Sequence, residues 1–154
     1  MDEHRKIFTP PGGPPHVAVP SPDIFNAMGE DGFYRMLADF YLMLSRSEIR
    51  DMFPSSAAAL LDASKRSAAF FIQICGGPPV YNQTFGPPRL RARHLPFEIG
   101  EREKSVWLDC FRSVLADAPQ KYGFPKVHLP GFIHWLTAFA GWMVNKKTEI
   151  DEVM

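Results

Sequence analysis

Apolar side chains recur at three- and four-residue steps in four stretches of the chain, and this spacing places them on one face of an α-helix. The four predicted helices end near Ser45, Cys75, Ala118 and Met143. Valine and isoleucine nowhere alternate with polar residues as they do in half-buried strands. The pattern therefore predicts an all-α fold.

Proline, glycine and serine mark the boundaries of these helices. A short helix starts after Ser21 and is broken within residues 29–32, which contain two glycines. A brief helical turn ends at the Phe-Pro pair 53–54, and a serine at 55 or 56 is suited to cap the long helix that follows. That helix ends at the Gly-Gly-Pro-Pro run 76–79, because proline has no amide donor.

Some positions on the apolar faces carry polar or small side chains. Tyr41 brings a hydroxyl into one face, and a buried hydroxyl without a partner costs about 1 to 3 kcal/mol, so we expect it to be hydrogen-bonded. Trp107 brings an indole N–H into another face. Ala63 and Ser67 are small where larger side chains would fill space. They indicate either close packing of two helices or a cavity above a flat ligand.

A histidine stands between prolines near the middle of the chain. His94 lies between Pro88 and Pro96, which leave room for about two helical turns. A helix this short can hold one imidazole at a fixed distance from a flat, apolar group. A lone histidine is weak support for a metal site, but this setting suits haem, whose iron needs an axial imidazole.

Length, charge and cysteine content narrow the picture. The 154 residues form one domain, and 17 basic side chains balance 17 acidic ones, so overall charge predicts neither nucleic acid nor an anionic membrane as partner. The N-terminus lacks the apolar core of a signal peptide, and the apolar stretch 131–144 is too short to span a bilayer. Cys75 and Cys110 lack metal-ligand spacing, which indicates reduced core residues and a cytoplasmic protein.

The proline content divides the chain into unequal regions. We expect a proline-rich N-terminal extension at 1–22, a helical domain at 23–147 and a C-terminal tail at 148–154. Prolines and two adjacent glycines oppose regular structure in the extension. It is either a passive, partly disordered tail, or Ile7, Phe8 and residues 17–19 pack on the domain.

Three motifs occur in order along the second half of the chain. They are GGPPVY at 76–81, GPPRLRARHLPF at 86–97 and SVWLDC at 105–110. Together they resemble the signature of the truncated haemoglobins, and the tryptophan is similar to that of their second group. The resemblance runs from about Ser21 to Asn145. It implies a bacterial truncated globin fold, a 2-on-2 helical sandwich around haem b, behind the proline-rich extension.

Residue by residue, the resemblance implies that His94 is the proximal iron ligand. The implied distal ligand-binding residues are Tyr41, Trp107, Ser67 and Ala63. This chain departs from the family pattern at two of them. Ser67 stands where leucine or glutamine is expected, and Ala63 leaves the usual place of a distal histidine empty.

The resemblance also implies the walls of a haem pocket and the partners of the haem propionates. The implied pocket residues are Phe40, Phe53, Phe71, Leu90 and Phe97. The implied propionate partners are Arg93, Tyr81 and Arg66. Arginine presents a planar fork to a carboxylate and tyrosine adds a neutral donor. Arg66 has an equal alternative as a solvated helix residue, and Arg89 and Arg91 are expected at the surface.

The implied function is reversible binding of dioxygen, or of NO or CO, with Tyr41 and Trp107 donating hydrogen bonds to the ligand. Two such bonds at about 1.5 to 3 kcal/mol each would slow ligand loss by about a hundredfold or more. The alternative is a haem-dependent peroxidase or NO dioxygenase. Because the sequence has no glycine-rich dinucleotide turn, a separate reductase would supply the electrons.

A third interpretation needs no haem: the chain would be a helical interaction module whose proline-rich arm recruits a partner. A Soret band in purified protein would exclude it. In every interpretation the protein is expected to be a monomer or a homodimer.

Overall fold

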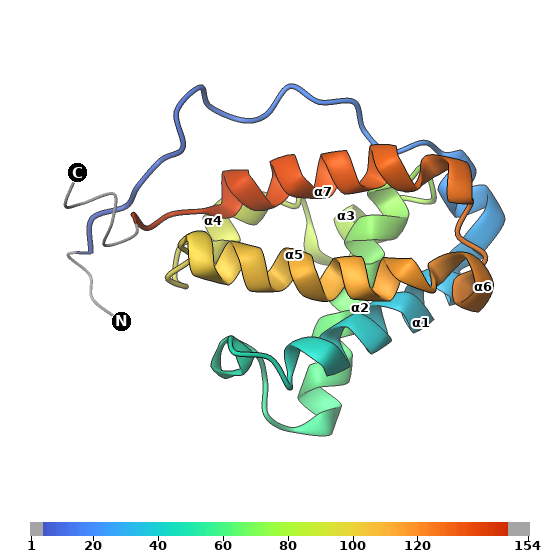
Figure 1. Ribbon diagram of the computed structural model, residues 1–154, viewed down its shortest axis with the longest axis horizontal. Coiled ribbons are helices and arrows are strands. Elements are labelled where there is room, and N and C mark those ends of the chain that lie inside the picture. Colours follow the sequence, from blue (N-terminus) through green and yellow to red (C-terminus); the bar gives the residue numbers. More distant parts are fainter. Residues whose placement is uncertain (1–4, 148–154) are drawn as a thin grey trace.

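The computed structural model describes residues 5–147, and every regular element in this range is helical (Figure 1). The elements are α1 (Asp23–Leu44), η1 (Arg50–Met52), α2 (Ala57–Ile74), α3 (Val80–Phe85), α4 (Leu90–His94), α5 (Glu101–Ala116), α6 (Ala118–Tyr122), η2 (Lys126–His128) and α7 (Leu129–Met143). The all-α prediction is confirmed for this range. The first residues of the extension and the predicted C-terminal tail lie outside it.

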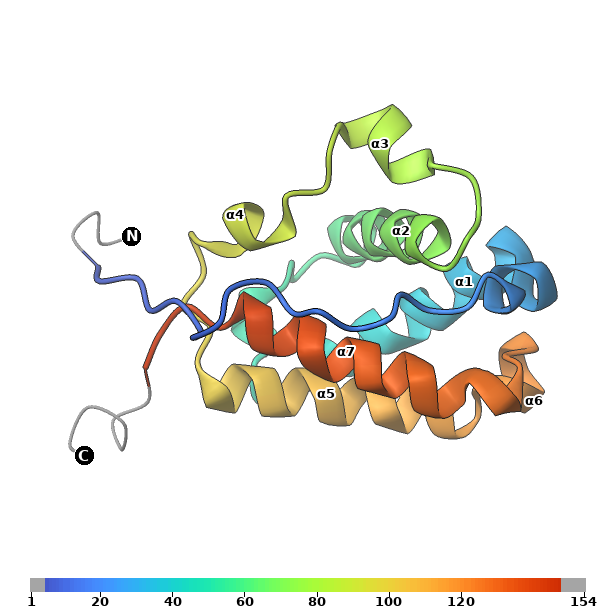
Figure 2. The same cartoon turned by 90° about the horizontal axis from the view of Figure 1, so that it is seen from above.

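Two pairs of helices form the two layers of the fold. Helix α1 crosses α2, and α5 runs beside α7, as Figures 1 and 2 show from two directions. Contacts between α1 and α5 join the pairs. The short α3 packs on α2, and the short α4 packs on α7. This is the implied 2-on-2 arrangement.

One phenylalanine joins all four long helices. Phe111 of α5 is fully buried, and its ring centroid lies 4.3 Å from Phe40 of α1 and 5.5 Å from Phe71 of α2. It also lies 5.8 Å from Phe132 of α7. Each aromatic pair contributes about 0.5 to 1.5 kcal/mol beyond the burial of its area. These contacts set the spacing between the two layers.

The helix boundaries follow the predicted signals closely. Gly29, with φ 66°, bends α1, which confirms the predicted break. The break is narrower than predicted, because Gly32 is helical and packs against the backbone of Tyr122. The hydroxyl of Ser56 accepts a hydrogen bond from the amide of Ala59 at 3.1 Å, so it caps α2 as expected.

The proline-rich segment is extended and runs along α7 (Figure 2). Val17 packs on the main core between the long helices. Phe8 packs on a second apolar cluster at the C-terminal end of α7, formed by Ile99, Met143 and Val144. Ile7 and Val19 stay exposed. The interpretation as a passive tail is therefore wrong for Phe8 and Val17, and the docking alternative holds for these two side chains.

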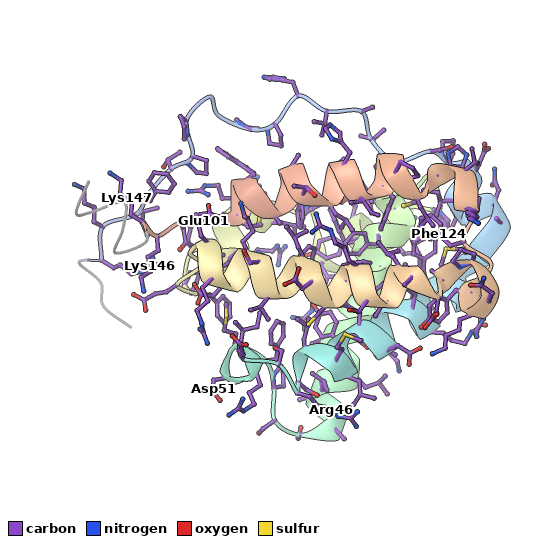
Figure 3. All side chains as sticks on the ribbon, viewed as in Figure 1. Arg46, Asp51, Glu101, Phe124, Lys146 and Lys147 are labelled. Atoms are coloured by element: carbon purple, nitrogen blue, oxygen red, sulfur yellow. The ribbon has the colours of Figure 1, made fainter. Side chains whose placement is uncertain are left out.

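Apolar side chains fill the space between the layers, whereas most charged side chains, such as Arg46, Asp51 and Glu101, lie at the surface (Figure 3). Buried Phe124 lies at one end of the molecule, and Lys146 and Lys147 lie at the other. Over residues 5–147, no helix combines the length and the apolar character needed to cross a bilayer.

Both cysteines are free and buried, as predicted. Burial raises the pKa of the Cys75 thiol to about 12. Burial, together with the charge of Asp109, also raises the pKa of Cys110. Both thiols are therefore protonated core residues at neutral pH.

We expect Gly76→Ala to lower the free energy of unfolding by about 2 to 4 kcal/mol. Gly76 has φ 90°, and an added Cβ would lie 2.5 Å from Cβ of Pro22, so the substitution adds a clash to backbone strain. Urea denaturation measures the loss. Gly29→Ala is the matched control, because it has φ 66° and open space around the Cβ position. An equal loss in both variants would show that the contact with Pro22 contributes nothing.

Candidate functional site

His94 is the last residue of the five-residue helix α4. Its Nδ1 lies 2.6 Å from the carbonyl oxygen of Leu90, one turn earlier. A carbonyl can only accept, so in the neutral imidazole Nδ1 carries the proton and Nε2 keeps its lone pair. The ring is half-buried, 6.4 Å from the ring of Phe97. The hydrogen bond to Leu90 therefore sets both the tautomer and the orientation of a possible metal ligand.

Arg93, beside His94, holds the loop that leads into α4. Its Nε donates to the carbonyl of Pro88 at 2.7 Å, and its Nη2 donates to the carbonyl of Phe85 at 2.9 Å. The guanidinium carbon also lies 5.6 Å from the ring centre of Tyr81. Phe85 ends α3, so Arg93 satisfies a carbonyl that the helix itself leaves without a partner.

Arg91 does not lie at the surface, and that expectation is wrong. Its guanidinium is part-buried and donates to the carbonyls of Phe8, Trp142 and Val144. It also lies 4.7 Å from the ring centre of Trp142. Burial lowers the pKa of Arg91, although a guanidinium stays charged at neutral pH. The acceptors come from both ends of the chain, so no local pattern could indicate them. Arg89 is exposed, as expected.

Tyr41 and Trp107 both contact the fully buried ring of Phe40. The centroid of Phe40 lies 5.7 Å from Tyr41 and 5.4 Å from Trp107, and both contacts are edge-to-face. Tyr41 makes a further edge-to-face contact with Phe53 at 5.7 Å. Two predicted donors, one from α1 and one from α5, are thus brought together by a single ring.

The Tyr41 hydroxyl is neutral at physiological pH. Burial raises its pKa above the ordinary value of 10.0, while a hydrogen bond with Ser67 and the charge of Arg66 oppose the rise. Tyr41 therefore keeps its proton and can act as a donor. Ser67 is therefore the candidate partner of the hydroxyl that its place on an apolar face requires.

Several apolar side chains in this region are only half-buried, although the core behind them is closed. They are Met52, Phe53, Leu90, Trp107 and Phe139. Met52, Leu90 and Phe139 contact both the main core and the second apolar cluster. Leu90 also lies in the same short helix as His94. Half-buried apolar side chains together with one oriented imidazole are what an apolar macrocycle that carries a metal ion requires. The residues present therefore fit haem.

The remaining predicted pocket residues take different positions. Ala63 is half-buried on α2, one turn before Ser67. Phe97 is 45% exposed beside His94. Phe71 is 2% exposed and packs on Phe111, so the structure places it in the aromatic core.

The two other predicted propionate partners lie near α3. Tyr81 is buried, with its ring 6.1 Å from that of Phe70. Arg66 is exposed and lies 5.3 Å from the ring centre of Phe85.

Phe70 and Phe139 belong to this region but are not among the predicted site residues. Their rings are stacked at 5.7 Å, and Phe139 lies 6.2 Å from Trp107. Phe70 stands three residues after Ser67, so helical spacing could have indicated it. Phe139 comes from the last helix, and its contact with Trp107 has no signal in the sequence.

An open cleft of about 520 Å³ lies beside this region, between Met52 and Phe97. Its lining includes Glu48, Asp51 and Glu98, as well as the guanidinium group of Arg5. A porphyrin needs apolar walls, so this charged cleft does not suit one. The candidate haem site is instead formed by His94 and the half-buried apolar side chains described above.

The match to a known family covers the segment that holds these residues. Residues 23–145 match the Bacterial-like globin family. The chain belongs to this family. It is therefore a haem-binding globin with the truncated globin fold, and the haem-free interaction module is set aside.

Curated relatives of this globin are named as truncated or two-on-two hemoglobins. It is 34% identical over 92 residues to group 2 truncated hemoglobin YjbI of Bacillus subtilis. The aligned residues cover 59% of this chain and 67% of that protein. It is 30% identical over 104 residues to two-on-two hemoglobin-3 of Arabidopsis thaliana, which covers 66% of this chain. The globin spans 58% of the length of that plant protein.

Solved structures show the same fold. Phosphate-bound Hell's gate globin IV is 35% identical, with a TM-score of 0.81 over 88% of this chain and 82% of that one. The group II truncated hemoglobin of Bacillus anthracis is 29% identical, with a TM-score of 0.73 over 90% of this chain and 99% of that one.

We expect Arg91→Met to lower the free energy of unfolding of this globin by about 2 to 4 kcal/mol, because buried carbonyls lose their charged donor. Arg89→Met, two residues earlier and exposed, should change it by less than about 0.5 kcal/mol. Chemical denaturation of both variants measures the difference. Similar values for the two would mean that the buried contacts of Arg91 add no stability.

Proposed function

We propose that this globin binds dioxygen reversibly, and NO or CO at the same place, at haem b held by His94. The observation that carries the proposal is the bond from Nδ1 of His94 to the Leu90 carbonyl, which leaves Nε2 free for iron. Haem, when bound, supplies the iron that coordinates a diatomic ligand. One solved relative, 31% identical, is described as an oxygen-avid truncated haemoglobin from Bacillus subtilis.

On the proximal side, the chain's task is to fix one imidazole. The Leu90 carbonyl polarises the ring and raises the basicity of Nε2, which strengthens its bond to a metal. The ring of Phe97 lies 6.4 Å from that of His94, and Leu90 packs on the main core; we propose both as apolar walls of the haem site. For the propionates we propose Arg93, Tyr81 and Arg66. The carbonyl contacts of Arg93 use Nε and Nη2, so Nη1 is its proposed propionate donor.

On the distal side, Tyr41 has one proton to donate. If that proton points at the ligand, a hydrogen bond between Tyr41 and Ser67 would run from the Ser67 hydroxyl to the Tyr41 oxygen. Two successive hydrogen bonds of this kind polarise the phenol and strengthen the hydrogen bond that it donates to the ligand. Ser67 would thus orient Tyr41, which leucine at the same position could not do.

Trp107 is the second proposed donor. An indole N–H can only donate, so it favours a ligand that accumulates negative charge. Together with Tyr41 it would slow ligand loss by about a hundredfold or more. Slow release suits scavenging, sensing or storage better than transport.

The same donors support a second candidate function. Donors at a distal site can polarise an O–O bond, which would suit a peroxidase or an NO dioxygenase. Either activity needs electrons, and we propose that a separate reductase would supply them.

We expect His94→Ala to lose stoichiometric haem and the native Soret band, because the metal then has no protein ligand. Absorbance spectra of purified protein, with haem quantified as the pyridine haemochrome, measure the loss. His134→Ala is the control, since His134 is exposed on α7. Native spectra in His94→Ala would overturn the assignment of the ligand.

We expect Tyr41→Phe to speed oxygen dissociation from the ferrous protein by about tenfold or more, because one donor is lost. Trp107→Phe should act in the same direction. Stopped-flow displacement of oxygen by CO measures both rates. Tyr34→Phe, which removes a hydroxyl from the same helix, should leave the rate unchanged. A Tyr41→Phe rate equal to that of Tyr34→Phe would mean that the phenol does not hold the ligand.

A further inference from the structure

The helix that carries His94 is too short to be stable without contacts to other parts of the chain. Helix α4 has five residues, and an isolated helix of that length is not stable in water. The carbonyls at its end and in residues 95–99 need partners from elsewhere in the chain. In this globin the partners come from the end of α7 and from the N-terminal segment 5–8.

Asn145, just after α7, is fully buried and binds this segment with its side chain. Its Nδ2 donates to the carbonyl of Phe97 at 2.9 Å and to that of His94 at 3.3 Å. Its Oδ1 accepts from the amide of Ile99 at 3.0 Å and from Arg5 at 3.1 Å. Both amide hydrogens and both acceptor sites of Asn145 are therefore in use.

Arg5 binds the same segment from the outside. Its Nη2 donates to the carbonyl of Leu95, the residue after His94, at 2.5 Å. Its Nη1 donates to Oδ1 of Asn145, so one guanidinium bridges the two. The Arg5 side chain is only 12% exposed, which shows that it is docked between them.

Phe8 supplies a second attachment for the N-terminal segment. Its amide donates to the carbonyl of Asn145 at 2.9 Å, and its own carbonyl accepts from Arg91 at 2.8 Å. Arg91 lies in α4, three residues before His94. The N-terminal segment therefore contacts the chain on both sides of the histidine.

We propose that residues 5–8 form part of the proximal side of the haem site and that Arg5 and Asn145 are positioning residues for His94. The inference rests on the proposed role of His94 as the iron ligand. The two residues act through the backbone at 94–97, which sets how far the imidazole can move towards or away from the metal. Loss of either contact would loosen that backbone and weaken the hold on haem.

The test uses the full chain with Arg5→Ala and Asn145→Asp. The aspartate keeps the shape and the Oδ1 acceptor but places an acceptor opposite the carbonyls of His94 and Phe97. Lys6→Ala is the matched control, because it removes the same charge from the adjacent, exposed position. We expect both test variants to pass haem to excess apomyoglobin about five to ten times faster, the effect of about one hydrogen bond.

A second readout separates positioning from stability. The iron–histidine stretching band of the ferrous, ligand-free protein should shift in Arg5→Ala and Asn145→Asp, return part-way in Arg5→Lys and stay in place in Lys6→Ala. In the haem-free protein, the Ile99 amide, which donates to Asn145, should exchange its hydrogen faster in Asn145→Asp.

Wild-type haem transfer and an unshifted band in Arg5→Ala would overturn the proposal, even if the melting temperature fell. Should Asn145→Asp fail to fold, Arg5→Ala decides, because Arg5 lies outside the two apolar clusters. His94→Ala keeps the two proposals apart. If that variant retains native haem, the ligand assignment fails; if it loses haem while Arg5→Ala behaves as wild type, only the positioning role fails.

Discussion

The hydrogen bond from Nδ1 of His94 to the Leu90 carbonyl is the interaction on which the site depends. It decides which ring nitrogen is left for a metal, and it exists only while α4 keeps its helical turn. A five-residue helix cannot secure that turn alone, so hydrogen bonds to segments outside the helix hold it in place. Arg93 holds the loop before α4, Arg91 connects α4 to the carbonyl of Trp142 in α7, and Asn145 holds the chain after α4.

The fold combines a closed aromatic core with a set of half-buried apolar side chains beside it. Phe111 and its three phenylalanine partners join the four long helices and leave little freedom between the layers. The half-buried apolar side chains lie beside this core, where haem would complete their burial. Phe40 belongs to both regions, since it contacts Phe111 on one side and Tyr41 and Trp107 on the other. The two proposed distal donors thus pack on the aromatic core that joins the four long helices.

The proximal and distal sides are built differently. The proposed distal donors come from the long helices α1 and α5, whose own backbone hydrogen bonds hold them in place. The proposed proximal ligand comes from a short helix whose following residues are held by Arg5 and Asn145. We infer that distal variants would chiefly alter ligand release, whereas changes at the chain ends would chiefly alter the hold on haem.

The sequence by itself determined the helices, their breaks and the identity of the proximal histidine candidate. These follow from local rules: apolar spacing for α1, α2, α5 and α7, positive φ at Gly29, a serine cap at Ser56, and prolines around His94. Only the tertiary structure decided that Arg91 is part-buried, that Phe71 belongs to the aromatic core and that Phe139 contacts Trp107. It also decided that Arg5 and Asn145 bind the segment that follows His94. The physical reason is the separation along the sequence between the residues that make contact. Spacing along a helix reports its near neighbours, whereas a hydrogen bond between residues 5 and 145 exists only after both ends of the chain have packed beside α4.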